Sequence, residues 1–350
     1  MKNFHPLTVK EIIRETPKAI SIVFEIPSNL NEVFHFDAGQ YITIKKKFDD
    51  HEIRRSYSIS STPGSTQLKV SVKQVEGGIF SSYANNTLKE GDVLDVFPPE
   101  GKFAYQAPTN GKSHDYAAFA AGSGITPILS ILKSVLKKES HSRFVLIYGN
   151  KTPQETIYFK ELLTIQQEFP DRVFIEFVYS QAKDKDSFFG RIERSTVNFV
   201  LKNKFKGHHF EAFYLCGPEP MIDLVSEVLL ENKVEEKRIH FELFTSTETG
   251  EVEANLDGKT TITVMVDDVE TIFEMDKKDS ILDAVLDKDL DAPYSCQGGI
   301  CSSCIARITE GKAEMMKNQI LTDAEIAEGL TLTCQAHPTT PTIKIDYDDV

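Results

Sequence analysis

The sequence Pro-Tyr-Ser-Cys-Gln-Gly-Gly-Ile-Cys-Ser-Ser-Cys, at residues 293–304, decides how the C-terminal part of the chain folds. Its three cysteines are spaced C-x4-C-x2-C, and one more cysteine follows after 29 intervening residues. A single loop brings three thiolates to one small cluster only if it curls tightly, and Gly298 and Gly299 allow the backbone angles that this requires. The spacing is typical of a [2Fe–2S] cluster with four thiolate ligands, here Cys296, Cys301, Cys304 and Cys334.

A structural zinc site is the alternative, because Cys301 and Cys304 alone form a C-x2-C hook. Zinc knuckles usually pair two such hooks, whereas here the second is a lone Cys334. We therefore predict the iron–sulfur cluster. The segment around it resembles plant-type ferredoxin, with Gln297 where many such domains carry Arg. The resemblance implies an α+β domain of the β-grasp type.

The length and composition favour an ordinary multidomain protein. The chain has 350 residues, of which 40% are hydrophobic, enough for two or three packed domains. No apolar run approaches the roughly 18 residues of a membrane helix, so we expect no membrane span. The five cysteines are the four proposed ligands and Cys216, which leaves none for a disulfide framework and favours a cytoplasmic location.

The charge is negative and unevenly spread. The formal net charge is −14, which argues against nucleic acid as a partner. Residues 254–350 carry 19 Asp and Glu against 8 Lys and Arg, a net charge of −11. This acidic surface is either simply solvated or a docking surface for a basic electron acceptor.

Residues 1–108 are expected to form a small antiparallel β-barrel. Short β-branched and aromatic runs, bounded by Gly, Pro, Asn or Asp, lie at 19–26, 41–44, 68–75 and 93–97. Several strands at such spacing are typical of a barrel. The run Pro98-Pro99-Glu100-Gly101-Lys102-Phe103 is expected to be the turn that leaves it.

Two features of this barrel suit a flavin. The run Arg54-Arg55-Ser56-Tyr57-Ser58 places an Arg, an aromatic ring and hydroxyls along a strand, although an ordinary polar strand face is the alternative. Gly77 and Gly78 follow a strand and open a helical stretch, where free backbone N–H groups form a nest for phosphate.

In this order the features resemble the ferredoxin–NADP reductase superfamily, whose R-x-Y-S motif matches Arg55, Tyr57 and Ser58. The resemblance implies that Arg55 pairs with a flavin phosphate, that Tyr57 contacts the isoalloxazine ring, and that Ser58 lies near its redox-active nitrogen. It also implies that Gly78 and Ser81 bind the pyrophosphate of FAD, with FMN as the alternative flavin.

Residues 109–246 alternate between strands and helices. We expect strands at 116–121, 144–148, 173–178, 213–216 and 239–244, and helices at 128–136, 155–167, 198–205 and 221–230. This alternation predicts a doubly wound parallel sheet, whose ligand lies at the carboxyl ends of the strands.

A glycine turn follows the first of these strands. The run Gly122-Ser123-Gly124-Ile125-Thr126-Pro127 has the form G-x-G-x-x-P, which the same superfamily carries, in place of the G-x-G-x-x-G dinucleotide fingerprint. The resemblance implies that Gly122, Gly124 and Thr126 cradle the pyrophosphate of a nicotinamide cofactor.

A second motif follows the strand at 213–216. The run Cys216-Gly217-Pro218-Glu219-Pro220-Met221 resembles the C-G-P-x-x-M signature of the superfamily, and a buried structural cysteine is the alternative. The resemblance implies that Cys216 lies where hydride leaves the nicotinamide, beside Gly217, Pro218 and Met221. Glu242 and Phe244 resemble its closing E-x-F, which puts Glu242 near the flavin and Cys216.

The residues that follow the second and third strands of this sheet should determine whether the chain prefers NADH or NADPH. Asn150-Lys151-Thr152 and Ser180-Gln181 stand there, with no acidic residue to hold a ribose 2′-hydroxyl. Lys151 and Ser180 suit a 2′-phosphate, which favours NADPH.

A linker rich in Ser, Thr, Gly and Glu is expected at 247–254, followed by the cluster domain at 255–350. In that domain we expect a hairpin of 261–266 with 270–275, a helix at 280–287, and strands at 305–310 and 343–347.

The three modules together predict an electron-transfer reductase. Nicotinamide delivers two electrons as a hydride, and a [2Fe–2S] cluster takes one electron at a time. A flavin can accept the pair and pass the electrons on singly. The resemblance, which covers nearly the whole chain, implies an NAD(P)H-dependent reductase for an oxygenase, of the kind that serves ring epoxidases and steroid hydroxylases. The alternatives are a free-standing NAD(P)H oxidase or ferric reductase, a carrier with decayed nucleotide sites, and a reductase for a hybrid-cluster or redox-sensing protein.

Overall fold

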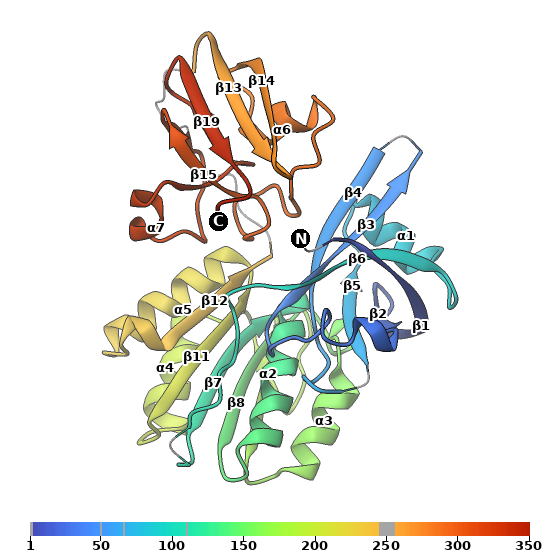
Figure 1. Cartoon of the computed structure of the whole chain (residues 1–350). Coiled ribbons are helices and arrows are strands. Elements are labelled where there is room, and N and C mark those ends of the chain that lie inside the picture. The colour runs from blue at the N-terminus through green and yellow to red at the C-terminus, as the bar shows by residue number, and fades with distance from the viewer. Residues whose placement is uncertain (1–2, 50, 66, 110, 245–255) are drawn as a thin grey trace. The chain divides into compact units, whose positions relative to one another are not determined.

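A computed structural model describes residues 3–49, 51–65, 67–109, 111–244 and 256–350 of the chain (Figure 1). The chain divides into two compact units, Met1–Phe244 and Thr245–Val350. The linker expected at 247–254 lies outside the described residues, and the boundary after residue 108 stays a prediction. Among the described residues, no helix is long and apolar enough to cross a membrane.

The first unit begins with the predicted antiparallel barrel. Its sheet has the strand order β4-β3-β6-β1-β2-β5, and a bridge between Ile59, just after β4, and Val70 joins the two edges. Two helical segments accompany it, η1 (Ser28–Leu30) and α1 (Ile79–Asn86). The strands are β1 (His5–Thr16), β2 (Ala19–Glu25), β3 (Tyr41–Phe48), β4 (His51–Ser58), β5 (Leu68–Lys73) and β6 (Val93–Glu100).

Burial explains why this sheet closes. Inward residues such as Ile20, Ile22, Val70 and Val72 are fully buried and form one core with Phe80 of α1. Closing the sheet takes this apolar inner face out of water.

The expected turn begins later than Pro98, because β6 continues through Glu100. The register of β3 against β6 shifts here: Thr43 lies opposite Phe97, but Tyr41 lies opposite Glu100. The shift accommodates the two prolines, which have no N–H to donate to a ladder. The chain turns only at Gly101, whose φ of +119° suits glycine.

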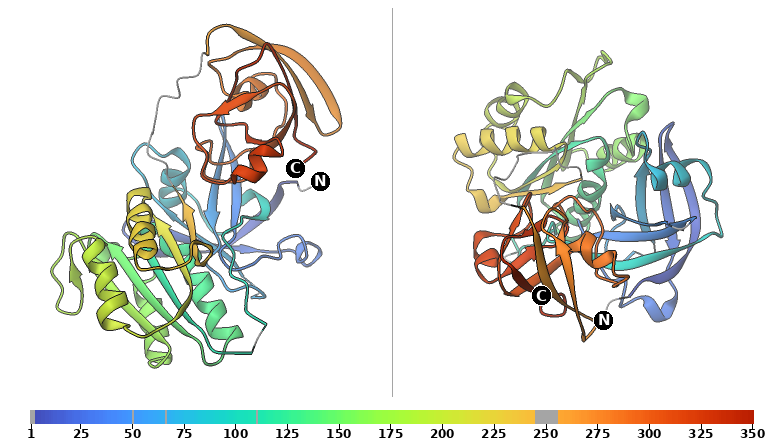
Figure 2. Two further views of the ribbon diagram at one scale, coloured as in Figure 1. Left: turned by 90° about the vertical axis from the view of Figure 1, so that its left-hand side faces the viewer. Right: turned by 90° about the horizontal axis from the view of Figure 1, so that it is seen from above.

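The predicted parallel sheet is confirmed, in the order β10-β9-β8-β7-β11-β12. Helices α2 and α3 lie on one face and α4 and α5 on the other (Figure 1 and Figure 2). The strands are β7 (Asp115–Ala121), β8 (Arg143–Asn150), β9 (Val173–Tyr179), β10 (Phe188–Phe189), β11 (Phe210–Gly217) and β12 (Ile239–Leu243). The helices are α2 (Ile125–Lys138), α3 (Phe159–Glu168), α4 (Arg194–Phe199) and α5 (Glu219–Glu231), with the short segments η2 (Gly122–Gly124), η3 (Pro153–Glu155), η4 (Val200–Lys204) and η5 (Glu236–Arg238).

The order of this sheet places its ligand edge. The strand order reverses between β7 and β11, and ligands of open parallel sheets bind at such a switch point, beyond the carboxyl ends. Both predicted motifs lie there, since Gly122 follows β7 and Gly217 ends β11. Helix α3 begins at Phe159, four residues later than expected, because Tyr158 has a φ of +61° and separates it from the turn at η3.

The second unit is a mixed sheet with short helices, as predicted. Its main sheet has the order β14-β13-β19-β15-β17, with β13 parallel to β19 and antiparallel to β14. The sequence did not indicate β16, β17, β18 or α7. Its elements are β13 (Lys259–Val266), β14 (Val269–Asp276), α6 (Ile281–Leu286), β15 (Ile305–Glu310), β16 (Ala313–Met315), α7 (Asp323–Ala327), β17 (Leu330–Leu332), β18 (Ala336–Pro338) and β19 (Thr342–Asp346).

Candidate functional site

Strand β4 carries the residues predicted to hold the flavin. Arg55 is exposed, and its guanidinium donates to the carbonyl of Arg54 at 2.6 Å. No carboxylate in the described part of the chain pairs with Arg55, whereas buried Arg54 donates to Glu52 at 2.8 Å. The ring centre of Tyr57 lies 5.7 Å from that of Phe80, and burial raises the pKa of its phenol. An arginine with no counter-charge beside a neutral phenol ring fits a flavin that carries phosphate.

The turn before α1 has the backbone that a phosphate nest needs. Gly77 has a φ of +72°, and a Cβ on Gly78 would collide with Ser81 Oγ and with Val75. The Ser81 hydroxyl donates to the Gly78 carbonyl and accepts from the Val75 N–H, both at 3.2 Å. Ser81 therefore braces the turn, and the backbone N–H groups of the first turn of α1 are the donors that face outward for phosphate.

The glycine turn after β7 is equally constrained. Gly122 has a φ of +56°, and a Cβ on Gly124 would collide with the carbonyl of Cys216. Thr126 is buried, and its hydroxyl donates to the Ser123 carbonyl at 2.9 Å. The two glycines thus let the start of α2 lie directly against the end of β11, with the first N–H groups of α2 facing the switch point.

The ends of β8 and β9, which are expected to determine the preference for NADH or NADPH, lie side by side. The N–H of Ser180 donates to the carbonyl of Asn150 at 3.0 Å, and that of Gln181 donates to Lys151 at 2.9 Å. The buried Nδ2 of Asn150 has no hydrogen-bond partner within the described residues. This atom is covered by the protein itself, so it does not mark the surface that a nucleotide would contact.

Three residues predicted to be catalytic come together at this edge. The hydroxyl of Ser58, at the end of β4, donates to Glu242 Oε2 at 2.9 Å, across 184 positions of sequence. Glu242 in β12 lies in register with Cys216 in β11. The end of the flavin strand therefore lies next to the carboxyl edge of the nucleotide sheet.

The electrostatics of these groups favour their uncharged forms. Burial raises the pKa of Glu242 to about 8, although the hydrogen bond from Ser58 opposes the shift. Burial and the neighbouring Glu242 raise the pKa of the Cys216 thiol well above its ordinary value. At neutral pH the raised pKa values favour a neutral thiol beside a protonated carboxyl.

The rest of the C-G-P-x-x-M motif shapes the loop beyond Cys216. A Cβ on Gly217 would come within 2.8 Å of Met221 Cε and 3.2 Å of the Cβ of Ala121. Pro218 caps α5, and its carbonyl accepts from the N–H of Met221 at 2.9 Å. The motif thus packs the start of α5 closely against the end of β7.

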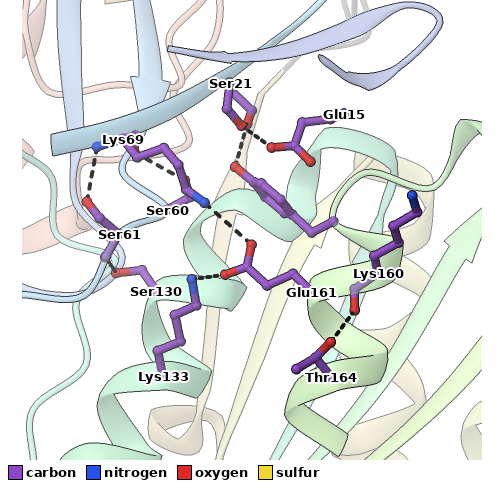
Figure 3. A network of polar contacts seen from close by, with 12 residues as sticks. Glu15, Ser21, Ser60, Ser61, Lys69, Ser130, Lys133, Lys160, Glu161 and Thr164 are labelled. Carbon is purple, nitrogen blue, oxygen red and sulfur yellow. Dashed lines mark hydrogen bonds and ion pairs between the residues drawn. The ribbon is translucent and has the colours of Figure 1, made fainter. Parts of the chain in front are cut away.

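A network that the sequence did not indicate joins the barrel to the nucleotide sheet (Figure 3). Glu161 of α3 accepts from Lys69 of β5 at 3.4 Å and pairs with Lys133 of α2. The hydroxyl of Ser130 donates to the carbonyl of Ser61 at 2.6 Å. Ser61 lies three residues after Ser58 in the sequence. Burial would raise the pKa of Glu161, but the charges of Lys133 and Lys69 outweigh it and lower that pKa.

The same interface buries a chain of hydroxyls. Tyr158, at the start of α3, hydrogen-bonds Ser71 of β5, whose hydroxyl lies 2.7 Å from that of Ser21. Ser21 in turn donates to Glu15 at 2.5 Å. These contacts fix the barrel against α2 and α3, the two helices that begin beside the nucleotide edge.

In the second unit, the four predicted cluster ligands converge. All four are free thiols, and the sulfurs of Cys304 and Cys334 lie 3.2 Å apart. Hydrogen bonds with Cys301 and Cys334 lower the pKa of Cys296. Gly299 has a φ of +71°, and a Cβ there would lie 2.8 Å from the carbonyl of Lys317, so the loop has no room for a larger residue.

The donor set of this unit consists of the four cysteine thiols. Within the described residues, no group of three or more His, Cys, Asp or Glu side chains is arranged around one metal position. Four thiols suit either zinc or an iron–sulfur cluster, and the spacing C-x4-C-x2-C favours the cluster.

Three family models match the chain, one over each of these regions. Residues 6–105 match the oxidoreductase FAD-binding domain, residues 119–227 the oxidoreductase NAD-binding domain, and residues 264–339 the 2Fe-2S iron-sulfur cluster binding domain.

Two curated relatives match over almost their whole length. One is a subunit of the 1,2-phenylacetyl-CoA epoxidase of Escherichia coli (strain K12), which is 37% identical over 99% of this chain and 99% of its own. The ferredoxin reductase component of 3-ketosteroid-9-alpha-monooxygenase from Rhodococcus rhodochrous is 31% identical over 97% of this chain and 96% of its own. The solved structure of phthalate dioxygenase reductase shares the fold, with a TM-score of 0.64, 23% identity, and 98% of each chain covered.

Proposed function

The chain belongs to the family of oxygenase reductase components that combine FAD-binding, NAD-binding and [2Fe–2S] domains, and from this we propose that it passes electrons from NADPH to the oxygenase component of a multicomponent enzyme. The protein is an oxidoreductase that uses FAD, a nicotinamide nucleotide and a [2Fe–2S] cluster. Bound flavin would accept a hydride from the nicotinamide and release its electrons singly.

The contact that carries the proposed mechanism is the hydrogen bond from Ser58 to Glu242, beside Cys216. In our proposal, Arg55 and the nest before α1 hold the flavin phosphates, and the Gly122 turn holds those of the nicotinamide nucleotide. Ser58, Cys216 and Glu242 then fix the hydride donor and acceptor in one orientation. Orienting two reactants in this way removes much of the entropic part of a barrier.

We propose an aromatic-ring or acyl-CoA epoxidase as the electron acceptor, because the relative at 37% identity belongs to 1,2-phenylacetyl-CoA epoxidase. A steroid monooxygenase is the second candidate, supported by the relative at 31% identity. The test is reconstitution of the purified chain with each oxygenase component, following product formation against nucleotide consumed. Consumption that is equally fast with no oxygenase present would support a free-standing oxidase instead.

We propose NADPH as the preferred donor because Lys151 and Ser180, and no carboxylate, stand at the ends of β8 and β9. The test compares kcat/KM for NADPH and NADH in the native chain and in Lys151→Glu. The variant should lose preference for NADPH by about tenfold to a hundredfold, since one ion pair to phosphate is removed and one repulsion added. If the ratio of kcat/KM for NADPH to that for NADH is equal in both proteins, residues other than Lys151 determine the nucleotide preference.

A further inference from the structure

The peptide group between Gln297 and Gly298 makes two hydrogen bonds in opposite directions. Its N–H, on Gly298, donates to Cys296 Sγ at 3.3 Å. Its carbonyl, on Gln297, accepts from Nε2 of Gln335 at 3.0 Å. Because a trans peptide is planar and directs its N–H and C=O to opposite sides, the bond from Gln335 holds the plane in the orientation that the N–H to sulfur bond requires.

The backbone at this point needs such support. Gln297 has a φ of +53°, in the left-handed region that a residue with a Cβ seldom adopts. A conformation of this kind persists only where surrounding contacts determine it. The side chain of Gln297 is exposed, so its own amide is not what holds it.

Gln335 is itself rigidly placed. It directly follows the fourth cysteine, and its Nε2 also donates to the carbonyl of Cys334 at 3.0 Å. Its backbone N–H donates to Leu332, and its carbonyl accepts from Met316, both at 2.9 Å. Gln335 is thus a fixed link between the two stretches of chain that carry the four thiols.

We propose that Gln335 is a positioning residue for the cluster, which keeps the Gly298 N–H on the sulfur of Cys296 and thereby raises the reduction potential. A donor to a thiolate stabilises the more negative, reduced form of a cluster more than the oxidised form. The bond to the Gln297 carbonyl also polarises the peptide, which makes its N–H a stronger donor. The inference rests on the four proposed ligands.

The test applies one chemical change to each partner of the bond. In Gln335→Met the side chain keeps its length but loses the donor, so the potential should become more negative. Loss of one hydrogen bond to the peptide should shift the one-electron equilibrium by about threefold to tenfold, or roughly 30–60 mV. The matched control is Gln297→Met, which removes an exposed amide but leaves the backbone carbonyl, and its potential should stay that of the native chain.

The potentials are measured on the full-length holoprotein by titration followed with electron paramagnetic resonance, after iron and sulfide content have been matched. An unchanged potential in Gln335→Met, or an equal shift in Gln297→Met, would overturn the proposal. If the methionine side chain in Gln335→Met prevents cluster insertion, Gln335→Ala is used instead. Alanine adds no bulk against Gly299.

A second measurement starts from the native protein and tests the N–H to sulfur bond directly. With glycine labelled by ¹⁵N, the reduced cluster should show an exchangeable proton coupled to a glycine nitrogen, and this coupling should weaken in Gln335→Ala. The absence of that coupling would overturn the role of Gln335 while the ligand assignment stands. A native protein with no iron and no cluster absorption would overturn the ligand assignment itself.

Discussion

At the scale of single residues, Glu242 has the property most open to a direct test. Burial raises its pKa to about 8, above the ordinary value of 4.5. A carboxyl whose pKa is higher in the folded state contributes stability that is complete below pH 4.5 and is lost as the pH rises through about 8. The same ionisation would put a negative charge beside Cys216.

We expect Glu242→Gln to remove this pH dependence. Between pH 6 and pH 9 the unfolding temperature of the native holoprotein should fall relative to that of the variant, and its rate of flavin reduction should decline above pH 8. Thermal unfolding and stopped-flow reduction at a series of pH values measure both. Parallel pH profiles in the two proteins would show that Glu242 titrates at an ordinary pH.

Cys216 is the second residue with a specific expected effect. Its fully buried thiol lies in register with Glu242, and the start of α2 lies directly against its carbonyl. We expect Cys216→Ala to slow flavin reduction by NADPH about tenfold to a hundredfold with little change in nucleotide affinity, because a small displacement of reacting groups is costly. A stopped-flow rate equal to that of the native chain would leave Cys216 with a packing role alone.

At the scale of elements, the contact between the barrel and helices α2 and α3 can be weakened at one position. Glu161→Gln leaves Lys69 and Lys133 without their shared carboxylate, and the side chain of Glu161 is 33% exposed, so solvent screens part of the loss. We expect a loss of about 1 kcal/mol in the free energy of unfolding.

Urea denaturation followed by flavin release and by circular dichroism measures this change. Glu168→Gln, at the exposed end of the same helix, removes an equal charge outside the network and should leave stability within about 0.5 kcal/mol. If the two variants lose equal stability, charge on α3 matters and the network does not.

The elements also show how far the sequence alone can be read. The glycine turns and the cysteine loop were predicted because their spacing is local and few backbones satisfy it. The turn expected from Pro98 begins only at Gly101, because the shifted pairing of β3 with β6 lets the strand continue past both prolines. Glu161 and Lys69 were missed because, far apart in sequence, each is indistinguishable from a solvated surface charge. The position of Glu242 near Cys216 was expected only through a family resemblance, and its hydrogen bond with Ser58 was not predicted.

At the scale of the whole molecule, the two compact units predict that the first one can work alone. A chain ending at Thr249 should fold, bind FAD and be reduced by NADPH, since Met1–Phe244 contains both nucleotide-binding sheets. It should reduce ferricyanide but fail to support an oxygenase. Full oxygenase turnover by the truncated chain would remove the cluster from the electron path.

The charge of the C-terminal part should govern its encounter with a partner. With a net charge of −11 over residues 254–350, electron transfer to a basic oxygenase should slow as salt is added from low ionic strength. Rates of partner reduction at a series of salt concentrations measure this. A rate that is flat across the series would assign the charge to solubility alone.

The core of the second unit has a consequence for the life of the protein in a cell. Cys304 and Cys334 belong to the same hydrophobic core as Leu332, Ile343 and Ile345, so two of the four proposed ligands are also core residues. Whatever binds the folded form and not the unfolded form stabilises it by mass action, and here iron and sulfide would do so. Under iron starvation, molecules without a cluster could not transfer electrons, and their C-terminal unit would also be the least stable. Proteolysis would then remove idle copies before working ones, and iron supply would set how many reductase molecules persist.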